Sequence, residues 1–98
     1  MKKIEYGMVT AVDVGVSWKR SNTEVVSEFG RRIKVYLFGN CIMKQSYNGV
    51  RYFSSAGWNT VTTRSRLRAL GCNVSCRGGI LYRDGKEWTE DPDFDYVV

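Results

Sequence analysis

The sequence predicts an α+β fold that is mostly antiparallel β-sheet, with six to eight strands, several hairpins and one short helix near residues 61–70. Two observations predict this class. Apolar and polar residues alternate over several stretches, which is typical of strands with one buried face. Asn-Gly, Gly-Gly and Asp-Gly pairs separate these stretches and favour tight turns. We expect one globular domain over residues 1–89 and an acidic, at least partly mobile C-terminal tail over residues 90–98.

The first predicted strand covers residues 4–18. Its apolar residues fall on even positions and most of its polar residues on odd positions, which is a period of two. The even set is Ile4, Tyr6, Met8, Val12, Val14, Val16 and Trp18. Because this stretch is long for one strand, we expect Gly7 or Gly15 to bend it or to mark a bulge.

Residues 19–23 are polar and predict a turn. Residues 24–29 then predict a short strand with Val25 and Phe29 on one face, although a helical turn opened by Asn22 also fits. After a break at Gly30, the next strand is predicted over residues 31–38. Its one face carries Ile33, Val35 and Leu37, and its other face carries Lys34, Tyr36 and Phe38.

Turn pairs define the remaining strands. Gly39-Asn40 is predicted to end the strand over residues 31–38. The other predicted strands are 41–46 and 50–54 around Tyr47-Asn48-Gly49, 72–77 and 80–83 around Gly78-Gly79, and 86–89 after Asp84-Gly85.

The predicted helix begins where Thr60 or Thr62 can cap it, and it ends at Leu70 with Gly71 as the left-handed residue that follows. At 100° per residue, Thr63, Leu67 and Leu70 form a narrow apolar stripe. Arg64 and Arg68 lie on one flank of this stripe, and Arg66 lies on the other.

The charge is segregated along the chain. Residues 29–83 contain ten Lys or Arg and no Asp or Glu, whereas residues 84–98 contain six acidic residues and one basic residue. Such asymmetry favours nucleic acid or another polyanion as a partner. We expect the central cations to gather into one exposed zone, over which the acidic tail could fold back as a competitor.

Aromatic residues are interleaved with these cations, as in proteins that bind single-stranded nucleic acid. The residues predicted to contact phosphates are Arg31, Arg32, Lys34, Arg51, Arg64, Arg66 and Arg68. The residues predicted to stack on bases are Tyr36, Phe38 and Trp58.

Catalytic and metal sites are not expected. The chain has no histidine, which removes the commonest general base, and it has no glycine-rich phosphate loop. Three cysteines without histidine do not make a zinc site, so we expect core thiols, no metal and no cofactor. No signal peptide or apolar membrane span is evident, which predicts a cytoplasmic protein without membrane contact.

Short motifs from Tyr36 to Leu67 resemble a small uncharacterised accessory domain of tailed bacteriophages. In that domain an aromatic strand of the form Y-x-(Y/F)-G-N-x-I leads through a hairpin to an aromatic loop and a Thr-Thr helix start. The matching residues here are Tyr36-Leu37-Phe38-Gly39-Asn40-Cys41-Ile42, Gly49, Phe53-Ser54-Ser55-Ala56-Gly57-Trp58 and Thr62-Thr63-Arg64-Ser65-Arg66-Leu67. Many members have a Lys/His step after the threonines, where this chain has Arg64-Ser65-Arg66. The resemblance implies a viral accessory protein made in a bacterial host.

The leading hypothesis is a small basic, non-enzymatic module that binds RNA or single-stranded DNA in the host cytoplasm. The alternative is a host-takeover or anti-defence protein that inhibits a host protein by binding an acidic surface. A third hypothesis is a structural or homo-oligomeric piece, for which exposed sheet edges suffice.

Overall fold

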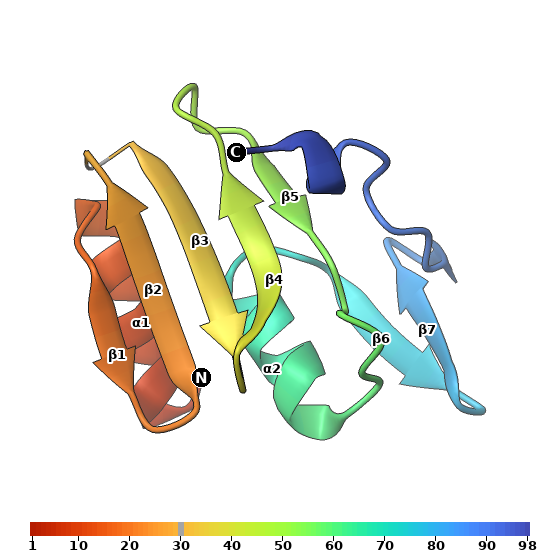
Figure 1. The fold of residues 1–98 in the computed structure, drawn as a ribbon. Helices are drawn as coiled ribbons and strands as arrows, with labels where there is room; N and C mark the ends of the chain where they lie inside the picture. The colour runs from red at the N-terminus through yellow and green to blue at the C-terminus, as the bar shows by residue number, and fades with distance from the viewer. Residues whose placement is uncertain (30) are drawn as a thin grey trace.

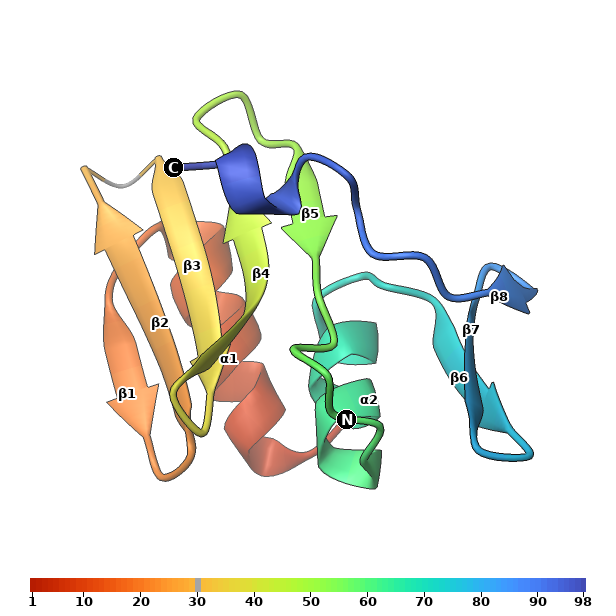
Figure 2. The same cartoon turned by 45° about the vertical axis from the view of Figure 1, so that its right-hand side comes forward.

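The computed structural model describes residues 1–29 and 31–98, and the predicted break at Gly30 lies outside them. A five-stranded antiparallel sheet in the order β1-β2-β3-β4-β5 has α1 and α2 on one face, and a smaller sheet β6-β7-β8 lies beside it (Figures 1 and 2). The elements are α1 (Lys3–Val14), β1 (Trp18–Arg20), β2 (Thr23–Glu28), β3 (Arg32–Leu37), β4 (Asn40–Gln45), β5 (Arg51–Phe53), α2 (Val61–Ala69), β6 (Val74–Arg77), β7 (Ile80–Arg83), β8 (Lys86–Glu87) and the short 3₁₀ helix η1 (Phe94–Tyr96). The α+β class, mostly β, is confirmed.

The long strand predicted for residues 4–18 is wrong over most of its length, because residues 3–14 form α1. Apolar residues spaced by four fit both a period of two and a helix face, and Met8 and Val12 are buried on the helical pattern together with Ala11. Tyr6 and Val14, which the strand pattern placed in the core, are exposed. The predicted turn at residues 19–23 is also displaced, since β1 and β2 occupy most of it.

Both glycines of this segment have a helical role instead of bending a strand. Gly15 ends α1 in the left-handed conformation, with φ of 81°. Gly7 lies under the Trp18 ring, and a Cβ atom there would be 2.7 Å from that ring. The absence of a side chain at Gly7 therefore lets β1 pack closely on α1.

The alternation predicted for β3 is confirmed. Ile33, Val35 and Leu37 are buried against the helices, and the residues between them face away from the core. A β-bulge shifts the register between β3 and β4 at Val35 and Tyr36. As a result, two consecutive residues of β4, Ile42 and Met43, are both buried.

Two phenylalanines occupy turns at the ends of β3 and neither enters the core. The turn between β3 and β4 is formed by Phe38 and Gly39, one residue earlier than predicted, with φ of 50° and 80°. Phe29, predicted to share the buried face with Val25, is 99% exposed and also has a positive φ. The predicted strand around Val25 is confirmed as β2, so the alternative helical turn is wrong.

The predicted capping of α2 is confirmed. The Thr60 hydroxyl accepts a hydrogen bond from the Thr63 backbone N–H at 3.1 Å, and Leu70 ends the helix ahead of Gly71, which has φ of 100°. The two hairpins that follow are also confirmed as β6-β7 and β7-β8.

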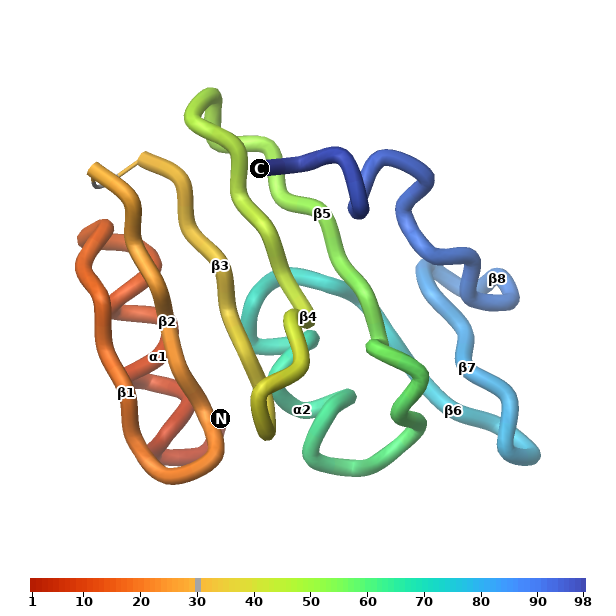
Figure 3. The backbone as a smooth tube through the Cα atoms, in the orientation of Figure 1, coloured from red at the N-terminus to blue at the C-terminus, as the bar shows by residue number. Residues whose placement is uncertain are grey.

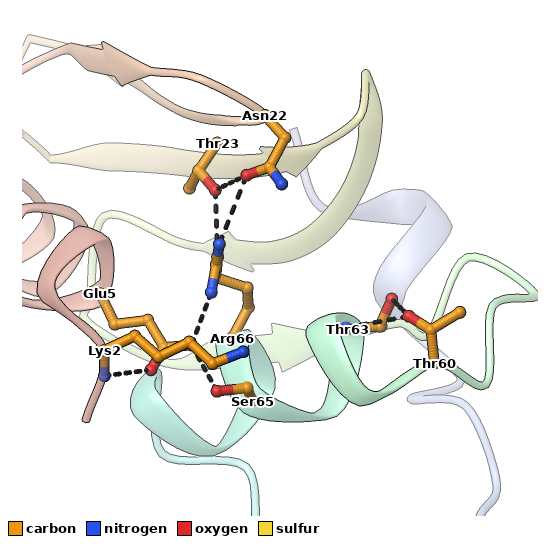
Figure 4. Close-up of polar contacts among 8 residues, drawn as sticks. All are labelled: Lys2, Glu5, Asn22, Thr23, Thr60, Thr63, Ser65 and Arg66. Atoms are coloured by element: carbon orange, nitrogen blue, oxygen red, sulfur yellow. Dashed lines mark hydrogen bonds and ion pairs between the residues drawn. The ribbon is translucent and has the colours of Figure 1, made fainter.

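The buried face of α2 contains an arginine. Arg66 is 4% exposed, and its Nη1 lies 2.7 Å from Oε2 of Glu5, which is 1% exposed (Figure 4). Arg66 Nε also donates to the Thr23 hydroxyl, and the Ser65 hydroxyl donates to Glu5 Oε2. This network joins α1, α2 and the start of β2. The prediction that Arg66 contacts phosphate is therefore wrong, because its guanidinium is enclosed by these partners.

The acidic tail is anchored at its start, where mobility was expected. As Figure 3 traces, the chain returns from β8 past β5. The Phe53 N–H donates to Asp91 Oδ2 at 2.7 Å, and the Ser55 N–H donates to Glu90 Oε1 at 3.1 Å. Arg83 Nη1 lies 2.8 Å from the other Asp91 oxygen. These contacts give hydrogen-bond acceptors to one backbone N–H of the edge strand β5 and to one in the segment that follows it.

The Arg66→Ala substitution is expected to lower the free energy of unfolding by about 3–5 kcal/mol, because it leaves the Glu5 carboxylate buried and unpaired. Chemical denaturation measures this change. Arg64→Ala is the matched control on the same helix, and as a partly exposed side chain it should change stability by about 0.5 kcal/mol or less. Equal losses for the two variants would contradict the role given to the pair.

Acid should weaken the fold through the same carboxyl. Burial by itself raises the pKa of Glu5, but hydrogen bonds from Ser65, the Lys2 backbone and Arg66 outweigh it, so the pKa lies below its ordinary value of 4.5. A lowered folded-state pKa adds stability above pH 4.5 that is lost as pH falls through the folded value. Glu5→Gln should flatten this acid limb in denaturation curves, and an unchanged limb would reject the assignment.

Candidate functional site

The face of the large sheet opposite the helices is open over β1, β2 and most of β3, and the C-terminal end of the chain reaches the start of β3 (Figures 1 and 2). Directly opposed residues of antiparallel strands share a face. Across this face Lys34 is opposed to Lys44, and Lys44 is opposed to Tyr52. Tyr36 is the neighbour of Lys34 two residues along β3, so lysines and tyrosines alternate in the middle of the sheet.

The two central lysines form a like-charge pair. Residues in directly opposed positions have Cβ atoms about 5 Å apart, and like charges there destabilise a sheet. Among the residues that the structure describes, neither Lys34 nor Lys44 makes an ion pair with a carboxylate. This arrangement is favourable for an external anion, because an anion would relieve the repulsion between the two ammonium groups.

Acidic residues also reach this face, from outside the acid-free span of the sequence. Glu24 is opposed to Tyr36, and Glu28 is opposed to Arg32, because β2 pairs with β3. Lys19 is in turn opposed to Glu24. The positive charge on this face is therefore concentrated over β3 and β4, whereas the part of the face over β2 carries charges of both signs.

A hollow of about 200 Å³ lies on this face and is lined by Val26, Glu28, Arg32, Lys34 and Tyr36. The hollow brings together Arg32, Lys34 and Tyr36, which are three of the residues predicted from the sequence to bind nucleic acid. Burial, followed by the nearby Cys41, Glu24 and Glu28, raises the pKa of Tyr36 above 10.0. The phenol is therefore uncharged at neutral pH and does not repel a phosphate.

The tail covers the β4 side of the same face. The Lys44 ammonium donates to the Phe94 carbonyl oxygen at 3.0 Å and lies 4.6 Å from the centre of the Phe94 ring. Figure 2 shows η1 in front of β4, on the side away from the helices. The tail thus contacts Lys44 with an aromatic ring and a carbonyl group, and the acidic Asp93 and Asp95 are the neighbours of Phe94 in the sequence.

The predicted cations do not gather into one zone. Arg51 lies on the helical side, where it donates to the Leu70 carbonyl at 2.9 Å and lies 3.6 Å from Asp13. Arg64 and Arg68 belong to α2, in the layer behind the sheet, and Arg68 donates to the Val74 carbonyl at 2.9 Å. Only Arg31, Arg32 and Lys34 of the predicted phosphate contacts lie on β3 or immediately before it.

The predicted stacking residues are also divided. Tyr36 lies on the open face, whereas Phe38 and Trp58 lie at the end of the sheet and line a separate pocket with the start of α2. Lys44 and Tyr52 were missed as site residues. Alternation around the Asn-Gly turn places Lys44 and Tyr52 on the same face of the β4-β5 hairpin. Only the register between β3 and β4 places this pair beside Lys34.

Two of the three cysteines, Cys41 and Cys72, have pKa values raised by burial. Burial raises the pKa of Cys41, which is opposed to Tyr36, and burial raises the pKa of Cys72 to about 11. Both side chains are therefore neutral thiols at neutral pH. Within residues 1–29 and 31–98, no helix has the length and apolar content needed to cross a membrane.

Comparison with known proteins places the chain in a viral setting. No curated protein and no solved structure is similar enough to match it. The model of one protein family, described as Kyanoviridae Gp96 protein, matches residues 1–97. This match covers nearly the whole chain and agrees with the resemblance to an uncharacterised accessory domain of tailed phages. The chain belongs to the Kyanoviridae Gp96 protein family of phages.

Proposed function

We propose that this phage protein is a non-enzymatic module that binds single-stranded nucleic acid, RNA or DNA, on the open face of its large sheet in the host cytoplasm. The observation that supports the proposal is the juxtaposition of Lys34 and Lys44, for which the described residues provide no carboxylate partner, with tyrosines on either side of it. Phosphates would lie against Lys34, Lys44 and Arg32, and bases would stack on Tyr36 and Tyr52.

A single strand fits this face better than a duplex does. A sheet face offers flat stacking surfaces to bases that are already unpaired, whereas base reading in a duplex usually needs an element that enters a groove. Each base stacked on an aromatic side chain contributes about 1–3 kcal/mol. The net charge of +5 adds a long-range attraction for a polyanion, which is screened by salt.

The double substitution Lys34→Ala/Tyr36→Ala is expected to weaken binding of a single-stranded oligonucleotide by about tenfold or more, since it removes one phosphate contact and one stacking surface. Fluorescence anisotropy with labelled RNA and DNA of mixed sequence measures the affinity at several salt concentrations. The wild-type affinity should fall steeply with salt, and the variant should show a shallower salt slope.

Arg64→Ala/Arg68→Ala is the control for this measurement. It removes two positive charges from the helical layer and leaves the open face intact, so the loss should be smaller than that of the sheet variant. Binding that is absent at low salt, or a larger loss from the α2 variant, would reject the open face as the binding surface.

Removal of the tail after Asp91 is expected to raise the affinity for the same oligonucleotides. The truncated chain keeps the Asp91 carboxylate that accepts a hydrogen bond from the Phe53 N–H, and it keeps Glu90. It removes Phe94 and so leaves the Lys44 ammonium without that partner. It also removes Asp93 and Asp95, whose negative charges repel a phosphate chain near Lys44.

A shorter truncation that removes only Val97 and Val98 separates the two parts of the tail, because it keeps Phe94 and the acidic residues and uncovers only the hollow that both valines line with Arg32. An affinity that is equal in both truncated chains and the full chain would show that the tail does not compete for this face.

A further inference from the structure

The hollow on the open face, between the neighbouring strands β2 and β3 (Figure 1), contains one carboxylate among its cations. Its lining is Val26, Glu28, Arg32, Lys34 and Tyr36. The register places Val26 opposite Lys34 and Glu28 opposite Arg32. A carboxylate beside these cations repels a phosphate chain. Glu28 is therefore compatible with a bound nucleic acid if its carboxylate meets a base instead of a phosphate.

The Glu28 carboxylate is available to such a base. Its side chain is exposed, and within residues 1–29 and 31–98 it forms no ion pair, although it is directly opposed to Arg32. An ionised carboxylate accepts hydrogen bonds and donates none. Its two oxygens can accept two parallel N–H bonds, and such charge-assisted pairs are stronger than bonds between neutral groups. Glu28 therefore suits a partner that presents two adjacent N–H donors.

The other lining residues suit the flat faces of a base and its phosphate. The hollow measures about 200 Å³. Pockets for whole drug-sized ligands measure about 300–1,000 Å³, so this hollow fits a single planar ring system better. Val26 is half-buried and offers apolar surface, and Tyr36 offers an aromatic ring. A base can lie against these two side chains with its polar edge toward Glu28, which leaves the Lys34 ammonium for the phosphate.

A carboxylate at the edge of a base distinguishes guanine from the other bases. The Watson–Crick edge of guanine presents two adjacent donors, the N1–H and the 2-amino group. Adenine and cytosine each present one amino donor beside a ring nitrogen that is an acceptor and would face the second carboxylate oxygen. Uracil and thymine present a single N–H between two carbonyl groups. Only guanine therefore satisfies both oxygens of Glu28 without placing an acceptor against an acceptor.

We propose that the hollow between β2 and β3 is a guanine-selective subsite for single-stranded nucleic acid and that Glu28 determines this selectivity. One guanine lies against Val26 and Tyr36, and its N1–H and 2-amino group donate to the two carboxylate oxygens of Glu28. Lys34 contacts the phosphate of the same nucleotide. This inference rests on the proposed function, to which it adds a base preference at one position of the bound strand.

Fluorescence anisotropy of the full chain with labelled ten-nucleotide strands tests this subsite. One strand contains only uridine, and the others carry a single central guanosine, inosine or adenosine; the same set is made as DNA with thymidine. Inosine lacks the 2-amino group and keeps the N1–H. The guanosine strand is expected to bind about fivefold or more tightly than the uridine strand, as for a bidentate contact to a base, and the inosine strand should lie between them.

Glu28→Gln should reduce the preference for guanosine to about twofold or less, because an amide offers one acceptor and one donor group in place of two acceptors. Glu24→Gln is the matched control. Glu24 is on the same strand and the same face, opposed to Tyr36, but it does not line the hollow. Both variants remove one negative charge, so both should bind the uridine strand slightly more tightly, and only Glu28→Gln should lose the base preference. Thermal melting verifies that both variants are folded.

The possible failures of the subsite and of the proposed function are distinguishable. Equal affinity for all the strands would overturn the guanine preference and leave the proposed function intact. A preference that persists in Glu28→Gln, or that falls equally in Glu24→Gln, would overturn the role of Glu28. Absence of binding to every strand at low salt would reject the proposed function and the subsite together.

Discussion

The buried ion pair between Glu5 and Arg66 is the constraint on which the arrangement of the layers depends. It joins α1 to α2 and, through Thr23, to the start of β2. A charged pair out of solvent is stable only when its remaining hydrogen-bonding capacity is met, and here Ser65 and the Lys2 backbone complete the set around Glu5. The pair therefore fixes how both helices lie on the same face of the sheet, which leaves the opposite face to the tail and to solvent.

This division separates two surfaces with different chemistry. The open face combines lysines with tyrosines on β3, β4 and β5, whereas the end of the sheet combines Phe38 and Trp58 with Thr60 and Thr63 at the start of α2. The tail covers part of the first surface through Phe94, which contacts Lys44 on the side away from the helices, and it reaches the second through the hydrogen bond from Ser55 to Glu90.

Local patterns were reliable where the structure is local. Alternation of Ile33, Val35 and Leu37 and the turns at Asn48-Gly49 and Gly78-Gly79 correctly predicted β3 and the hairpins, because a hairpin needs only neighbouring residues. The pattern failed for α1, since spacings of four satisfy both a strand and a helix. For the candidate site, alternation identified Lys34 and Tyr36 but missed Lys44, whose place beside Lys34 depends on the register between strands.

The sequence by itself determined the class of the fold, most of its turns, the cap of α2 and the presence of excess positive charge. The tertiary structure decided what that charge can contact. Arg66 does not have its predicted role because it pairs in the core with Glu5, which lies 61 residues earlier in the chain. The acid-free span is not free of acidic neighbours in space, because β2 carries Glu24 and Glu28 next to β3. Electrostatic surroundings depend on distance in space, and pairing between distant segments sets that distance.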